Sequence, residues 1–184
     1  ECKSIMINVT IPNLDSILRR LPNEIKARTV LMRSINRSAA SGKTIASKKV
    51  RQEYVLKAGT VNQATKIAKA STSSLEAKIT WKGPMVNLKN FRINPKTRPK
   101  RKTKRQMVAE VKKGKKATYK GAFIGPNGQV FRRTTKKRFP IKPVYGPSIP
   151  HLMGADQVRE ETQKRTLEVL IKRVDHEISR MIGS

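Results

Sequence analysis

Hydrophobic and polar residues alternate in the two segments of the chain that most clearly predict strands. The first is "IMINVTI" at 5–11 and the second is "LEAKITW" at 75–81, and each has an apolar residue at every second position. A period of two is typical of a strand that buries one face. After a turn at Gly83–Pro84, the segment "MVNLKNFRI" at 85–93 predicts a further strand.

A helical period occupies the region between these strands. Its apolar and small residues recur in steps of three, four or seven, at Ile25, Met32, Ile35, Ala39, Gly42, Ala46 and Val50. This spacing predicts a helix of roughly eight turns, and Pro22 suits its first turn. The small residues in the stripe indicate that another backbone approaches closely. That backbone belongs either to the sheet of the same chain or to a helix of a second subunit.

Further helices are predicted at 12–21, at 60–70 ("TVNQATKIAKA"), and in an amphipathic C-terminal segment that runs from Val158 to Ile182. The C-terminal segment has apolar residues at Val158, Leu167, Leu170, Ile171, Val174, Ile178, Met181 and Ile182, and its polar side alternates in sign. "GPNG" at 125–128 predicts the tip of a β-hairpin. The order of these elements predicts an α+β fold in which long N-terminal helices precede an antiparallel sheet with a basic insertion and the C-terminal helix. We expect one domain over 1–184.

The charge of the chain is unusually one-sided. It has 42 Lys and Arg against 12 Asp and Glu, which gives a formal net charge of +30. Between Arg92 and Lys142 there are 19 basic residues and a single carboxylate, Glu110. The segment 94–116 is therefore predicted to be a basic, flexible insertion. Such a charge needs an anionic partner, which is a nucleic acid, a membrane surface or an acidic protein assembly.

No residue pattern in the sequence predicts catalysis or metal binding. Cys2 is the only cysteine, and neither His151 nor His176 lies in a metal-ligand spacing such as HExxH. "SGKT" at 41–44 matches the end of a phosphate-binding loop, but it lacks the first glycine and lies inside a helical pattern. No run approaches the roughly 18 apolar residues of a membrane span. We predict no enzymatic activity, no cofactor and no membrane association.

An ordered series of short motifs resembles the phage minor tail protein Z family. The series is "SINRSA" and "KKVRQEYVLKAG" in the first long helix, "LEAKITWKGPMVNLKNF", "GAFI" at 121–124, "GQVFRR" at 128–133, and "KRFPIKPVYGPSIPHLM" at 137–153. The resemblance covers about residues 22–182, and the basic insertion cannot be aligned. It implies a virion protein at the head-proximal end of the tail, assembled in the host cytoplasm, which completes the tail for head–tail joining. Its implied partners are the tail terminator, the tube and the head–tail connector, and it implies self-association in a sixfold ring.

The proline-rich segment before the last helix is a candidate docking segment. Its residues are Phe139, Pro140, Ile141, Val144, Tyr145 and Pro147, and Ser148 is placed to cap the following helix. Prolines remove backbone donors, so the segment cannot be a central strand. It is either a stiff lead-in that only sets the angle of the last helix or a contact with another subunit or the tail tube, and the two roles are compatible.

The candidate contact residues of the basic insertion are Arg98, Lys100, Arg101, Lys102, Lys104 and Arg105. They contact either packaged DNA or an acidic neighbouring protein, or they form a solvated arm without a partner. We favour the protein, because DNA must slide past this site. Aromatic residues for base stacking are not interleaved with these cations, so any contact with nucleic acid would be limited to its backbone. The alternative function is a sequence-independent nucleic-acid-binding protein of ribosomal or nucleoid type.

Overall fold

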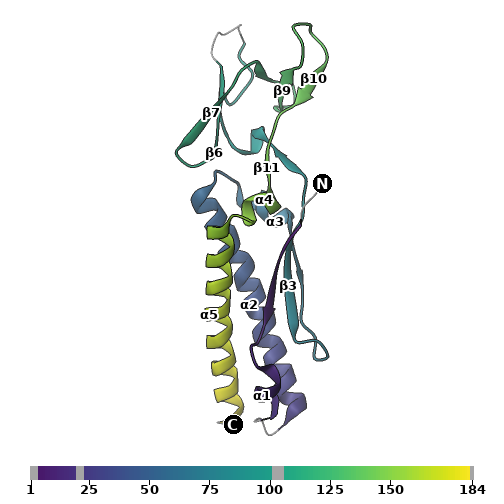
Figure 1. Ribbon diagram of the computed structural model, residues 1–184, viewed down its shortest axis with the longest axis vertical. Coiled ribbons are helices and arrows are strands. Elements are labelled where there is room, and N and C mark those ends of the chain that lie inside the picture. The colour runs from purple at the N-terminus through teal and green to yellow at the C-terminus, as the bar shows by residue number, and fades with distance from the viewer. Residues whose placement is uncertain (1–3, 20–22, 101–105, 183–184) are drawn as a thin grey trace.

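Two long antiparallel helices lie side by side along the long axis of the molecule (Figure 1). The computed structural model describes residues 4–19, 23–100 and 106–182. Helix α2 (Glu24–Glu53) packs along helix α5 (Asp156–Ile182). The sequence therefore predicted both helices correctly.

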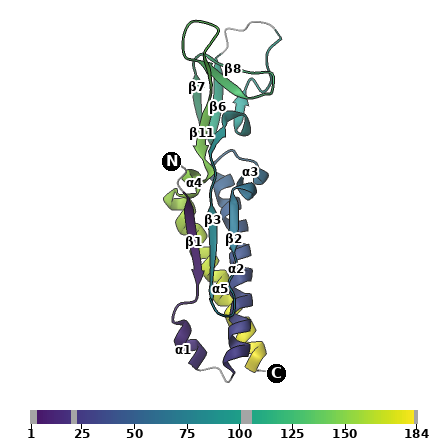
Figure 2. The same ribbon diagram turned by 90° about the vertical axis from the view of Figure 1, so that its right-hand side faces the viewer.

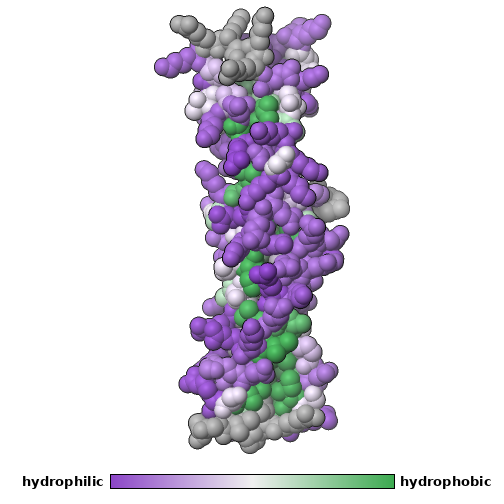
Figure 3. Space-filling view, turned by 90° about the vertical axis from the view of Figure 1, so that its left-hand side faces the viewer, coloured by the Kyte–Doolittle hydropathy of each residue, from purple (hydrophilic) through white to green (hydrophobic). Residues whose placement is uncertain are grey.

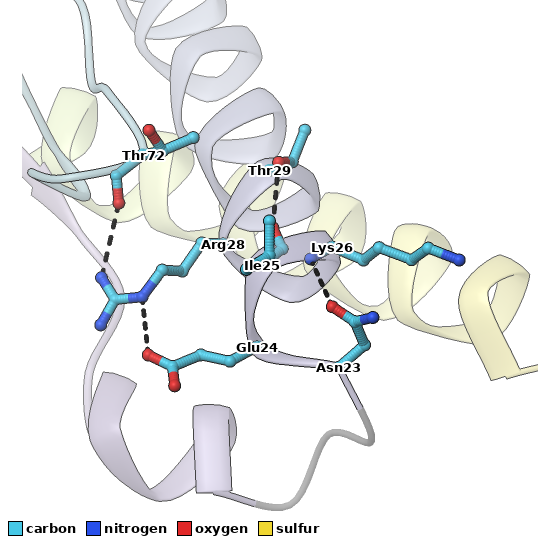
Figure 4. Close-up of polar contacts among 7 residues, drawn as sticks. All are labelled: Asn23, Glu24, Ile25, Lys26, Arg28, Thr29 and Thr72. Carbon is cyan, nitrogen blue, oxygen red and sulfur yellow. Dashed lines mark hydrogen bonds and ion pairs between the residues drawn. The ribbon is translucent and has the colours of Figure 1, made fainter.

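The first turn of α2 is fixed by polar contacts (Figure 4). The side chain of Asn23 accepts a hydrogen bond from the backbone N–H of Lys26 at 3.0 Å, which satisfies one of the donors that a helix start leaves free. The Arg28 guanidinium donates to Glu24 at 2.9 Å and to the carbonyl of Thr72 at 3.4 Å. The start of α2 is thereby joined to the loop that lies between two strands of the neighbouring sheet.

A three-stranded antiparallel sheet covers one side of the helix pair (Figure 2). Its strands are β1 (Ile5–Thr10), β3 (Glu76–Trp81) and β2 (Thr65–Ala68), in the order β1-β3-β2. The register pairs Ile7 with Ile79 and Ile67 with Ile79. The alternating apolar residues of β1 and β3 are buried apart from Ile5, which is half-buried, and both strands pack against α2, so both strand predictions are confirmed.

Two short helices flank this sheet, and one prediction there is partly wrong. Helix α1 (Leu14–Arg19) lies within the predicted segment 12–21. The helix predicted at 60–70 is shorter, α3 (Ala58–Gln63), and the rest of that segment forms β2. Helix propensity is a weak prior that tertiary context overrides. Here β3 offers an edge to which residues 65–68 pair.

The contact between α2 and α5 is close because the facing side chains are small. A Cβ atom added at Gly42 would lie 2.7 Å from Oγ1 of Thr166 and 2.9 Å from Cδ1 of Ile79. The small-residue stripe of α2 therefore contacts the sheet and α5 of the same chain, which confirms the first of the two interpretations. The predicted positions from Ile35 to Val50 are buried as expected. Only the N-terminal turns differ, where Ile25 is 80% exposed and Ala27 and Leu31 are fully buried instead.

The other end of the molecule is made of short strands, and we call it the β lobe (described residues 83–100 and 106–148; Figure 1). It contains three small antiparallel sheets with the orders β11-β4, β5-β6-β7 and β10-β9-β8. The elements are β4 (Met85–Asn87), the 3₁₀ helix η1 (Leu88–Asn90), β5 (Arg92–Asn94), β6 (Met107–Lys112), β7 (Lys115–Tyr119), β8 (Ala122–Ile124), β9 (Val130–Arg133), β10 (Ile141–Pro143) and β11 (Tyr145–Ser148). The short helix α4 (Ile149–Met153) leads from β11 to α5. The predicted α+β class with antiparallel sheets is confirmed.

The hairpin predicted at "GPNG" connects β8 and β9. The N–H of Gly125 donates to the carbonyl of Gln129 at 2.8 Å, and the N–H of Gly128 donates to the carbonyl of Gly125 at 3.0 Å. Gly128 has φ +73°, a conformation that glycine adopts without steric cost. Ile124 is thereby paired with Val130, and both side chains are buried.

Candidate interaction surfaces

Every Lys and Arg in the described part of the β lobe has an exposed side chain. They come from three places in the lobe: η1, β5 and the segment after it, the β6–β7 hairpin with the residue after β7, and the β9–β10 hairpin. The residues are Lys89, Arg92, Lys96, Arg98 and Lys100; Lys112, Lys113, Lys115, Lys116 and Lys120; and Arg132, Arg133, Lys136, Lys137, Arg138 and Lys142. Lysine and arginine from separate strands thus cover one end of an elongated molecule.

The one acidic residue in the described β lobe, Glu110, cannot offset this surface charge. Its side chain is 7% exposed and lies opposite Arg92 in the β5–β6 register. Oε1 accepts from the N–H of Gly114 at 2.9 Å, and Oε2 accepts from the Arg92 guanidinium at 3.2 Å. The backbone hydrogen bond from Gly114, with the nearby Arg92 charge, lowers the pKa of Glu110 below its ordinary value of 4.5 although burial opposes the shift. Glu110 therefore remains ionised at neutral pH, and its hydrogen bond from Gly114 stabilises the β6–β7 turn.

The predicted contact residues are only partly within the described ranges. Arg98 and Lys100 are exposed in the segment that follows β5, whereas Arg101, Lys102, Lys104 and Arg105 lie outside the described residues. Residues 107–116 of the predicted insertion belong to β6, the turn and the start of β7, and Met107 and Ala109 are buried. The insertion is thus partly built into a sheet, and its flexibility stays a prediction.

The cations of the two hairpins were missing from the predicted contact residues. A signal for them was present in the composition, because the basic excess extends from Arg92 to Lys142. That count alone did not reveal that the β6–β7 and β9–β10 hairpins belong to the same lobe, since this depends on how the strands pair.

The predicted docking segment divides into a buried part and an exposed part. Val144 is half-buried, its N–H donates to the carbonyl of Val130 at 2.8 Å, and its carbonyl accepts from the N–H of Leu88 at 3.2 Å. In contrast, Phe139 is 62% exposed and Tyr145 is 48% exposed. Val144 thus fixes the segment to its own lobe, whereas Phe139 and Tyr145 are accessible to a partner.

The prolines of this segment lie where the sequence required them to lie. Strand β10 is at the edge of its sheet, and β11 pairs with β4 in a two-stranded sheet. Pro140 is exposed, Ile141 and Pro147 are half-buried, and the side chain of Ser148 caps α4 by accepting from the N–H of His151 at 3.4 Å. The segment thus leads directly into the capped helix α4, and both its role in setting the angle of the last helix and its contact with a partner stay predictions.

A family model described as prophage minor tail protein Z (GPZ) matches residues 8–183. The chain belongs to this family. The resemblance carried by the sequence motifs is confirmed, and the match extends further toward the N-terminus than those motifs did. Searches of curated proteins and of solved structures gave no match. As a minor tail protein, the chain is a structural component of the phage tail and hence of the virion, among other tail proteins.

An apolar-lined cleft of this minor tail protein lies between its two ends, where the β lobe joins the helices. It has a volume of about 820 Å³ and is lined by Tyr54, Met85, Pro147, Pro150 and His151, among others. His151 is exposed and has no acidic residue among the lining side chains. The cleft therefore offers partly apolar contact area at this junction.

Within residues 4–19, 23–100 and 106–182, no three His, Cys, Asp or Glu side chains are grouped so that they could hold a metal ion. Over the same ranges, no helix combines the length and the apolar character needed to cross a membrane.

Proposed function

We propose that this minor tail protein completes the head-proximal end of the phage tail and makes the tail competent to join the filled head. The proposal rests on family membership and on one observation, the exposed basic residues of the β lobe. Their charges are not balanced within the lobe, because the described lobe has Glu110 as its one carboxylate and that group is buried and ion-paired. The basic side chains therefore repel one another, and an acidic partner would remove this repulsion. Because charges farther apart than about 8 Å are largely screened, the partner must lie against the lobe.

The partner that fits best is the carboxylate-rich surface of a neighbouring tail or neck protein, such as the tail terminator, the tube or the head–tail connector. DNA has to slide past this position during ejection, and a strongly binding cationic ring would slow it. Phe139 and Tyr145 add apolar area next to the cations, and exposed aromatic residues commonly anchor protein interfaces. In the virion, several copies would form a ring around the tail axis, sixfold as the tube is.

The test replaces three exposed cations of the β9–β10 hairpin, as Lys136→Gln, Lys137→Gln and Arg138→Gln together. The matched control replaces three exposed cations of α2, as Arg33→Gln, Arg37→Gln and Lys48→Gln. Each variant complements a phage that lacks the gene, and infectious titre and negative-stain images are recorded. We expect unjoined heads and tails with the β-lobe variant and intact particles with the control.

A second variant set tests the insertion by the same assay, with Arg98, Lys100, Arg101, Lys102, Lys104 and Arg105 changed to Gln. Circular dichroism first establishes that each variant is folded. Normal titres from both β-lobe variants, in folded proteins, would contradict a partner role for the basic surface. Normal titres and joined particles from a phage without the gene would contradict the function itself.

The same cations favour a second function, sequence-independent binding of nucleic acid. This function predicts that the purified protein shifts any duplex, with an affinity that falls steeply with salt, by a log–log slope of about −0.9 for each phosphate contact. If the β-lobe variants lose duplex binding but still join heads to tails, nucleic acid is the partner of this surface. If they join poorly and the wild type does not bind duplex, the partner is protein.

A further inference from the structure

Helix α5 exposes apolar side chains on the side that does not pack against α2. Leu167 is 42% exposed and Ile171, one turn later, is 51% exposed. Figure 3 views the side of the molecule on which α5 lies in Figure 1, and an apolar strip descends along the lower part of this face between hydrophilic side chains. The sequence pattern assigned both residues to the buried side of the helix, so their exposure needs an explanation.

Charge on α5 differs from charge in the rest of the chain. The helix contains six acidic and six basic residues, whereas the whole chain has a net charge of +30. Four exposed charged residues border Leu167 and Ile171, namely Lys164, Glu168, Lys172 and Asp175. None of these four has an opposite charge within 4.0 Å in the described parts of the chain. A second chain could therefore use all four without breaking an existing ion pair.

When two copies of α5 run in opposite directions, the charged residues of one copy lie opposite residues of the opposite charge on the other. Lys164 and Asp175 lie equally far from the point midway between 169 and 170, and Leu167 and Ile171 lie close to that point on either side. In an antiparallel pair of α5 helices centred there, Lys164 of each copy faces Asp175 of the other. Glu168 faces Lys172 with an offset of about 1.5 Å, the rise of one residue. A parallel pair would instead place Lys164 against Lys164.

We infer that α5 docks antiparallel on α5 of a second copy of this chain, with Leu167 and Ile171 at the centre and two kinds of reciprocal ion pair around them. The position of the β lobe supports the antiparallel direction. The lobe lies beyond the N-terminal end of α5 (Figure 1), and α5 has 27 residues, or a length of about 40 Å. Antiparallel docking therefore places the two basic lobes at opposite ends of the dimer, where their repulsion is smallest.

This contact is separate from the ring of the proposed function. Two antiparallel helices form a two-fold, self-complementary contact, whereas a cyclic ring of six is built from head-to-tail contacts. The inferred dimer is the form of the free protein in solution. A failure of the dimer leaves the tail-completion assay unaffected, and a failure of that assay leaves the dimer unaffected.

The test measures the mass of the purified full chain by size-exclusion chromatography with light scattering, at several protein concentrations and near-physiological salt. The wild type should approach twice the chain mass of 20.8 kDa as concentration rises. Lys164→Glu and Asp175→Lys, each alone, place like charges opposite each other at two positions and should give monomers. Lys48→Glu, on the exposed outer side of α2, makes the same change in charge as Lys164→Glu and should leave the dimer intact.

Mixing gives the sharpest result. In an equimolar mixture of the Lys164→Glu chain and the Asp175→Lys chain, each reversed residue faces an opposite charge, so the dimer should return, as it should in the double variant. Ile171→Ser should weaken the dimer at least tenfold, whereas Ile25→Ser, at an apolar residue of α2 that is 80% exposed, should not. A wild type that is monomeric at every concentration overturns the inference. A dimer that survives both single reversals, or a mixture that stays monomeric, also overturns it.

Discussion

Replacement of Gly42 by alanine tests the closest contact of the fold, and the sign of the result is informative. An exposed helical glycine changed to alanine stabilises a protein by about 1 kcal/mol, because alanine has the higher helix propensity. At Gly42 the new methyl group would meet Thr166 Oγ1 at 2.7 Å and Ile79 Cδ1 at 2.9 Å. Thr166 cannot easily turn away, since it is buried and its hydroxyl donates to the carbonyl of Thr162 at 2.6 Å.

Overpacking of this kind costs about 1–3 kcal/mol. After the gain in helix propensity is subtracted, Gly42→Ala should destabilise the protein by about 1 kcal/mol. For a chain of this length that corresponds to a fall in Tm of about 2–4 °C. Chemical denaturation and thermal melts followed by circular dichroism measure both quantities.

Two controls separate crowding from helix propensity. Ala40→Gly, on the exposed side of the same helix, should lower stability by about 1 kcal/mol through propensity alone. Thr166→Ala removes the side chain that the new methyl group meets, so Gly42→Ala should cost less in that background, and the two changes should couple. A stabilised Gly42→Ala variant would refute the close packing of α2 on α5.

Three further results are expected. The carboxylate of Glu110 has a lowered pKa, so it adds stability that is fully present above its ordinary pKa of 4.5 and is lost as the pH falls through its pKa in the folded protein. The Tm of Glu110→Gln should therefore depend less on pH between about 5 and 3 than the Tm of the wild type does. The same pH dependence of Tm in both proteins would contradict the buried ion pair. Ser148→Ala removes the cap of α4, whose hydrogen bond is long at 3.4 Å, and should cost about 0.5–1 kcal/mol in chemical denaturation, whereas Ser73→Ala in the exposed loop before β3 should cost less. Phe139→Ser should leave Tm within about 1 °C because the ring is 62% exposed, and a larger fall would show that the ring is needed for folding.

The sequence predicted those elements whose pattern depends on one buried face. Strands β1 and β3 alternate cleanly, and α2 and α5 each have a long apolar period, so all four were expected close to their observed positions. Strand β2 was not expected, because its four residues carry little pattern of their own and it exists by pairing with β3. The buried face of α2 was predicted correctly from Ile35 onward and was wrong only in the first turns, where a stripe through Ile25 and Met32 fits the period nearly as well as the true one through Ala27 and Leu31.

The candidate surfaces were predicted in the same uneven way. Composition alone predicted a basic region, and proline spacing alone excluded the docking segment from a sheet centre. The burial of Glu110 was not predictable, because it depends on the β5–β6 register across the insertion. Exposure of Leu167 and Ile171 was also hidden, since an amphipathic pattern shows that a helix has an apolar side but not how much of that side the rest of the chain covers.

The β lobe and the C-terminal end of α5 lie at opposite ends of the elongated molecule, so its two ends can be told apart (Figure 1). A small gold-binding tag fused behind α5 and another inserted at the β9–β10 turn would report on opposite ends of the same subunit. In electron micrographs of labelled virions, the two tags would reveal which end of the subunit points toward the capsid and which toward the tail tip. The orientation of the protein in the particle can thus be read directly from the fold's asymmetry.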